Sequence, residues 1–138
     1  MIEFFDEDNK LGVATIYDRH ILFNSKLKKF FDSAYRVRVG IDKDANELYF
    51  FMINKDYALS GEINETSLLP VSISKSYARV ASKNLIKFIS DSFGLKINKD
   101  ESKQYNAKYD ESKKAIIIDM GGTKWWNTWF GFGLVYLS

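Results

Sequence analysis

Nine lysine and arginine side chains are the strongest candidates in this sequence for a binding function. They lie in two blocks, residues 11–40 and 71–100, each with a net charge of +4, and the block between them has a net charge of −4. Binding of nucleic-acid phosphates needs several cations on one surface. We therefore interpret the following as candidate nucleic-acid-binding residues: Lys26, Lys28, Lys29, Arg36, Arg38, Lys75, Arg79, Lys83 and Lys87. The alternative is that these charges are ordinary solvated residues on exposed faces.

Three tryptophans near the C-terminus form a second candidate site: Trp125, Trp126 and Trp129. Aromatic side chains bring a large contact area at a low cost in entropy, so these residues could bind a protein partner. The alternatives are burial in the core of this chain, stacking on unpaired bases, or contact with a membrane surface. We treat them as candidate partner-binding residues.

Catalytic chemistry has little support in this sequence. His20 lies two residues from Asp18, a spacing at which a strand would place both side chains on one face, but no nucleophile motif accompanies them. Asp42 and Asp110 could form an acid–base pair only if an internal repeat placed them together. The chain has no cysteine and one histidine, which removes thiol nucleophiles and leaves little for zinc. We expect no enzymatic activity, no metal site and no cofactor.

A weak internal repeat coincides with the two basic blocks. It relates an extended run and a helix at an offset of 58 residues, and a hairpin at an offset of 68. The matched segments are residues 21–24 with 79–82, 27–31 with 85–89, 37–42 with 105–110, and 48–50 with 116–118. The change of offset predicts a ten-residue insertion after the second helix, where residues 96–104 are polar. Each unit therefore has the order strand, short helix, hairpin.

Local signals set the limits of these elements. The two hairpins are expected to turn at residues 43–46 and 111–114, and the second helix to run from about Lys83 to Ser92 and end at Gly94. Residues 57–77, which contain Pro70, are expected to connect the units through one or two strands. After the second hairpin, large side chains of one parity and glycines of the other predict an aromatic strand.

Length and composition favour one folded domain. The chain has 138 residues, of which 46% are hydrophobic and 16% aromatic. We expect an α+β fold of antiparallel β-hairpins with two short helices in pseudo-repeated strand-helix-hairpin units, at about residues 13–53 and 71–120, and an aromatic C-terminal strand within 121–138. The acidic N-terminus does not resemble a signal peptide, and the longest apolar run is too short to span a membrane. A cytoplasmic location without membrane contact is expected.

A strand, a short helix and a hairpin with an acidic turn, present twice in one small chain, resembles the AbrB-type swapped-hairpin proteins, particularly tandem MraZ-like regulators. Residues 21–51 and 79–119 carry this resemblance. It implies that two units interlock into one compact β-barrel that presents basic residues to DNA. It also implies that a tandem copy completes the pair within one chain.

Two functional hypotheses follow. The first is a non-catalytic DNA-binding or DNA-associated regulatory module, with the basic blocks on phosphates and Arg36 or Arg38 against base edges. The second is a small protein-interaction factor, such as a phage or mobile-element inhibitor of a host nuclease or defence protein. Its aromatic C-terminus or a sheet edge would dock on the partner. Neither hypothesis specifies whether the chain forms an oligomer.

Overall fold

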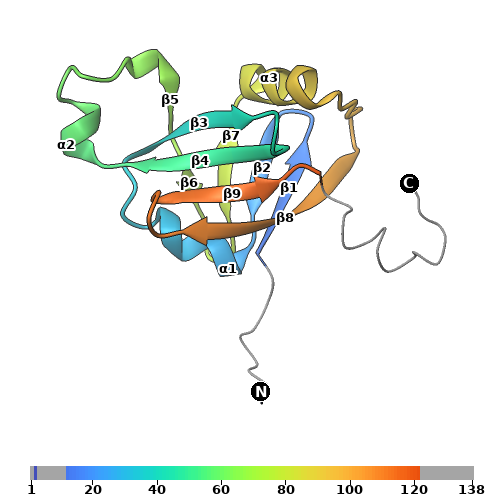
Figure 1. Cartoon of the computed structure of the whole chain (residues 1–138), viewed down its shortest axis with the longest axis horizontal. Coiled ribbons are helices and arrows are strands. Elements are labelled where there is room, and N and C mark those ends of the chain that lie inside the picture. The colour runs from blue at the N-terminus through green and yellow to red at the C-terminus, as the bar shows by residue number, and fades with distance from the viewer. Residues whose placement is uncertain (1, 3–11, 122–138) are drawn as a thin grey trace.

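In a computed structural model, the chain is described at Ile2 and at residues 12–121. These residues form an α+β fold in which antiparallel strands curl into a half-barrel sheet accompanied by a few short helices (Figure 1). Among them, no helix is long and apolar enough to cross a membrane. The predicted aromatic C-terminal strand falls almost entirely outside this range.

The sheet has nine strands in the order β5-β3-β4-β9-β8-β1-β2-β7-β6, and every neighbouring pair is antiparallel. The strands are β1 (Val13–Tyr17), β2 (His20–Phe23), β3 (Arg36–Asp42), β4 (Glu47–Ile53), β5 (Leu68–Leu69), β6 (Ser72–Ile73), β7 (Ala78–Ala81), β8 (Ser102–Asp110) and β9 (Ala115–Asp119). The two edge strands, β5 and β6, are separated in sequence only by Pro70 and Val71. Because so short a connection holds both edges together, the sheet must curl.

Short helical segments occupy the connections between strands. They are α1 (Ser25–Lys28), η1 (Lys29–Phe31), α2 (Lys55–Ala58), η2 (Glu65–Ser67) and α3 (Lys83–Phe93). The longest, α3, begins where the Ser82 hydroxyl accepts a hydrogen bond of 3.1 Å from the Leu85 amide. It ends at Gly94, whose φ of 66° is the left-handed conformation typical of helix ends. The predicted limits of this helix are confirmed to within one residue.

One hydrophobic core fills the concave side of the sheet. Side chains alternate along each strand, so every second residue points inward. The buried inward residues include Ala14, Ile16, Ile21, Phe23, Val37, Leu48, Phe50, Val80, Ile116 and Ile118. The rings of Phe23 on β2 and Phe50 on β4 meet edge to face at 5.0 Å. This contact joins the two halves of the sheet.

The element order agrees with the predicted strand, helix and hairpin in each segment. These are β2, α1, β3 and β4 in the first, and β7, α3, β8 and β9 in the second. The predicted connecting segment contains α2 and η2 as well as strands β5 and β6. Strand β1 was not among the predicted elements, although it pairs with β2 across a short turn and its buried residues Ala14 and Ile16 alternate with less buried ones. This local signal was missed.

The two hairpins contact each other reciprocally. The amide of Met52 donates to the carbonyl oxygen of Lys114 at 2.9 Å, and the amide of Met120 donates to that of Asn46 at 2.8 Å. The two donors, Met52 and Met120, are 68 residues apart, and so are the two acceptors, Asn46 and Lys114. Asn46 and Lys114 also share a positive φ, of 56° and 52°. The β3–β4 and β8–β9 hairpins are therefore related by an approximate two-fold arrangement.

Candidate functional site

The convex face of the β3–β4 hairpin changes charge along its length. Residues directly opposite each other in an antiparallel pair point to the same side of the sheet. The outward pairs are Arg38 with Phe51, Gly40 with Tyr49, and Asp42 with Glu47. One end of this face is therefore cationic and the other acidic, with aromatic rings between them.

A groove of about 630 Å³ lies at the cationic end. It is bordered by α2 on one side and by the turn between β8 and β9 on the other. We define the basic groove by six of its lining residues: Arg38, Gly40, Phe51, Tyr57, Lys113 and Lys114. None of the described residues that line it is acidic.

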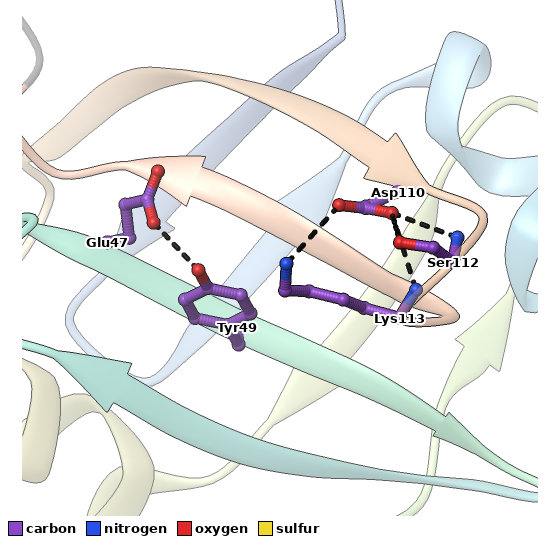
Figure 2. A network of polar contacts seen from close by, with 5 residues as sticks. All are labelled: Glu47, Tyr49, Asp110, Ser112 and Lys113. Atoms are coloured by element: carbon purple, nitrogen blue, oxygen red, sulfur yellow. Dashed lines mark hydrogen bonds and ion pairs between the residues drawn. The ribbon is translucent and has the colours of Figure 1, made fainter.

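Two of the three groove cations are electrostatically uncompensated. Within the described part of the chain, Arg38 and Lys114 have no carboxylate within ion-pair distance. Lys113 Nζ lies 3.7 Å from Asp110 Oδ2, and its side chain is 51% exposed, so solvent screens this pair (Figure 2). The groove consequently keeps a local positive charge although the net charge of the chain is only +2.

Asp110 holds the turn that carries the two groove lysines. Its Oδ1 accepts hydrogen bonds from the Ser112 hydroxyl at 2.6 Å and from the Ser112 amide at 2.9 Å, and a longer one from the Lys113 amide (Figure 2). The Ser112 hydroxyl, more than any other contact, lowers the pKa of Asp110 below its ordinary value. The carboxylate is therefore charged at neutral pH and fixes the start of the turn.

Tyr49 and Phe51 contact each other, and each makes one further contact. The rings of Tyr49 and Phe51 lie nearly parallel, at 13° and a centroid distance of 5.6 Å. The Tyr49 hydroxyl donates to Glu47 Oε1 at 2.7 Å (Figure 2), and this hydrogen bond, followed by desolvation, raises the pKa of Tyr49 to about 12. Phe51 also packs on a small cluster formed by Ile53, Ala58 and Ile63. These contacts restrict the positions of both rings.

The remaining wall and floor come from Tyr57 and Gly40. Asn54 caps α2 by accepting a 2.8 Å hydrogen bond from the Tyr57 amide, and the Tyr57 side chain is 40% exposed. At Gly40 a Cβ atom would stand 3.5 Å from Phe51 Cε2, at ordinary contact distance. The absence of a side chain at Gly40 keeps the groove open beside the Phe51 ring.

The corresponding place on the second hairpin has the opposite character. A groove of about 340 Å³ is lined there by residues that include Glu47, Asn106, Lys108, Ile117 and Asp119, and we call it the acidic groove. At the offset of 68, Arg38 corresponds to Asn106, Gly40 to Lys108 and Phe51 to Asp119. Of these two grooves, the basic groove is the one that combines unpaired cations with aromatic rings.

The helix lysines predicted as phosphate contacts lie at opposite ends of the sheet. In the antiparallel β2–β7 ladder, Phe23 at the end of β2 pairs with Ala78 at the start of β7. Because α1 follows β2 and α3 follows β7, the two helices begin at opposite ends of these strands (Figure 1). Lys26, Lys28 and Lys29 belong to α1 and η1, and Lys75 lies in the β6–β7 turn at the same end. Lys83 and Lys87 belong to α3, where Lys87 forms an ion pair with Asp91 at 2.8 Å. The two clusters do not share a surface.

The three predicted arginines also separate. Arg38 alone lines the basic groove. Arg36 donates from Nη1 to the Tyr35 carbonyl oxygen at 2.8 Å, and its guanidinium lies 4.2 Å from the centre of the Tyr35 ring. Arg79 is exposed on β7, opposite Leu22. Arg36 is thus engaged by its own neighbour, and Arg79 belongs to a different part of the convex face.

Neither of the two possible acid–base pairs comes together in the described part of the chain. Asp18 lies in the turn between β1 and β2, so strand alternation does not place it with His20. Asp42 and Asp110 stand at opposite ends of the four-stranded ladder and each accepts hydrogen bonds from its own turn. Among the described residues, no cluster of three or more histidine or carboxylate side chains could hold a metal ion.

Five of the six residues that define the basic groove were missed by the sequence interpretation: Gly40, Phe51, Tyr57, Lys113 and Lys114. A signal existed for Phe51. Like Tyr49, it occupies a position of β4 whose side chain points outward, and small or polar residues are usual at such positions. Adjacent lysines in a hairpin turn were a second signal. That this turn lies beside the β3–β4 hairpin depends on long-range pairing.

Trp125, Trp126 and Trp129, the candidate partner-binding residues, lie outside the described residues. Comparisons with protein-family models, with curated proteins and with solved structures found no match. Among the residues that the structure describes, the basic groove is the feature from which we infer a function.

Proposed function

We propose that this chain is a non-catalytic DNA-binding regulatory module that contacts phosphates through the basic groove. The observation that carries the proposal is the convergence of Arg38, Lys113 and Lys114 on one groove whose described lining has no acidic residue. Several cations on one surface gain affinity because each phosphate contact releases condensed counterions.

The local distribution of charge supports this proposal better than the net charge does. A net charge of +2 gives little long-range attraction to nucleic acid. At the basic groove, however, Arg38 and Lys114 have no ion-pair partner among the described residues, so their full charge is available to a ligand. Arg38 can also offer two parallel N–H donors, which suits recognition of a phosphate or a guanine edge.

The relation between the two hairpins supports a tandem swapped-hairpin arrangement. The reciprocal Met52–Lys114 and Met120–Asn46 hydrogen bonds are what two copies of one unit would form across a two-fold axis. The resemblance to AbrB-type proteins implies such a pairing of units and a DNA-binding role. Under this proposal, the chain supplies both units by itself.

The test is a salt titration of binding by fluorescence anisotropy, with a labelled random duplex and a labelled single strand. From about 50 to 200 mM salt, the affinity should fall steeply, with a slope set by the number of phosphates contacted. Changing Arg38→Gln together with Lys114→Gln should lower the magnitude of that slope by about 0.7 to 0.9 per lost contact. The matched control is Lys83→Gln with Lys87→Gln on α3, which removes two charges outside the groove.

Two results would count against the proposal. If neither nucleic acid binds at low salt, the chain is not a DNA-binding module, and a search for protein partners of Trp125, Trp126 and Trp129 is indicated. If the α3 control reduces the slope while the groove variant leaves it unchanged, phosphates bind at the helix lysines and the basic groove is not the site.

A further inference from the structure

The size of the basic groove suits one or a few nucleotides better than a double helix. Its volume of about 630 Å³ lies within the roughly 300 to 1,000 Å³ typical of small-ligand sites. A duplex presents its phosphates outward and keeps its base faces stacked inside. Aromatic rings set in a groove can therefore stack only on bases that are unpaired.

Rings and cations line the groove together. Phe51 lies directly opposite Arg38 on the neighbouring strand, so a base on the ring would have its own phosphate close to a guanidinium. Tyr57 supplies a second, exposed ring from α2, and Lys114 a second cation from the β8–β9 turn. Single-strand sites of low sequence preference combine these same two features, a cationic track and stacking rings.

The acidic groove limits where such a strand can run. A chain of phosphates that followed the convex face away from Arg38 would meet Glu47 and Asp119, which line the acidic groove. Like charges repel, so the ligand should stay at the cationic end. The two hairpins are therefore related by an approximate two-fold axis in backbone but not in charge, and we expect one of the two grooves to bind the strand.

Resting on the proposed function, we infer that the ligand of the basic groove is single-stranded nucleic acid. Unpaired bases stack on Phe51 and Tyr57, and the adjoining phosphates contact Arg38 and Lys114. Duplex DNA contacts the same cations but not the rings, so it binds more weakly.

The experiment compares a labelled single strand of about 12 nucleotides with a duplex of the same length and sequence. Wild-type protein should bind the single strand more tightly. Tyr57→Ala and Phe51→Leu should each weaken single-strand binding about 5- to 150-fold, the usual contribution of one base–ring stack. Neither change should alter the salt slope, because no phosphate contact is lost.

Tyr77→Ala is the matched control, since Tyr77 is 38% exposed, against 40% for Tyr57, and lies in the β6–β7 turn outside the groove. Its effect should stay within about twofold. Thermal melts of each variant show whether it is folded, and exposed Tyr57 provides a test that does not disturb the core.

The outcomes separate this inference from the proposed function. If the duplex binds as tightly as the single strand, or if both ring variants bind the single strand like wild type, the inference is overturned. The proposed function survives either result provided that the Arg38→Gln and Lys114→Gln pair still weakens binding. If no nucleic acid binds at low salt, both are wrong.

Discussion

Arg79 illustrates how a single cation acts through its nearest neighbours. It is exposed on the convex face of β7, and its positive charge acts electrostatically on His20 of the adjacent strand β2. Burial, then the Arg79 charge, lowers the pKa of His20 below 6.5, while Asp18 opposes the shift. The ring of Tyr17 stacks on the imidazole at 4.6 Å. Because His20 is the only histidine in the chain, it reports on this part of the surface.

Changing Arg79→Gln should raise the pKa of His20, since one of the two causes that lower it is removed. A histidine whose pKa is lower in the folded state binds protons more readily when unfolded. Its contribution to stability is therefore complete above the unfolded pKa near 6.5 and is lost as the pH falls through the folded pKa. An NMR titration of the imidazole carbon-bound protons measures the folded-state pKa of His20 in the wild-type and Arg79→Gln proteins.

Arg36→Gln is the control for this titration, because Arg36 lies on β3, not beside His20, and is held by the Tyr35 carbonyl oxygen. It should leave the His20 titration where it is. A His20 pKa that stays unchanged or falls in the Arg79→Gln protein would contradict the electrostatic explanation.

At the scale of elements, helix α3 shows how a local signal fixes a boundary. Its start depends on the Ser82 hydroxyl, which satisfies an amide of the first turn. Its apolar side chains Leu85, Ile86 and Ile89 then enter the core. Both the cap and the terminal glycine are visible in the sequence, and this is why the helix could be predicted without knowledge of the sheet.

Removing the cap by Ser82→Ala should lower the free energy of unfolding by about 1 kcal/mol, within a usual range of about 0.5 to 2. Chemical denaturation with urea measures this difference. Ser76→Ala, at an exposed serine of the β6–β7 turn, should change it by less than about 0.5 kcal/mol. Equal effects of the two substitutions would rule out a capping role for Ser82.

For the whole molecule, the contact between Phe23 and Phe50 links strands that are far apart in the sheet order. Both rings are fully buried in the shared core. Phe50→Ala should therefore lower the free energy of unfolding by about 3 to 5 kcal/mol, as a large cavity in a packed core does. Phe88→Ala, at a ring on α3 that is 44% exposed, is the control and should cost much less.

Urea unfolding followed by two probes, circular dichroism and tyrosine or tryptophan fluorescence, would measure both variants. Coincident transitions are expected, because one core serves both halves of the sheet. A Phe50→Ala protein that loses less than about 1 kcal/mol would show that the halves are stabilised independently.

The sequence by itself determined the elements with short-range signals. Gly94 predicted the end of a helix, the turns at residues 43–46 and 111–114 predicted two hairpins, and the offset of 68 residues predicted that these hairpins would correspond. Each of these depends on residues within a few positions of one another, or on a pattern repeated along the chain. The positions of α1, α3 and both hairpins, and the cationic character of Arg38, were therefore accessible.

Only the tertiary structure decided which side chains meet. Lys114 and Phe51 are far apart in the sequence, with the connecting segment and most of the second unit between them. They line one groove because β4 pairs with β9. The same antiparallel pairing of β2 with β7 places the helix lysines at opposite ends of the sheet. Strand pairing is a long-range choice made by burial of the whole core, and no local pattern of residues encodes its partner.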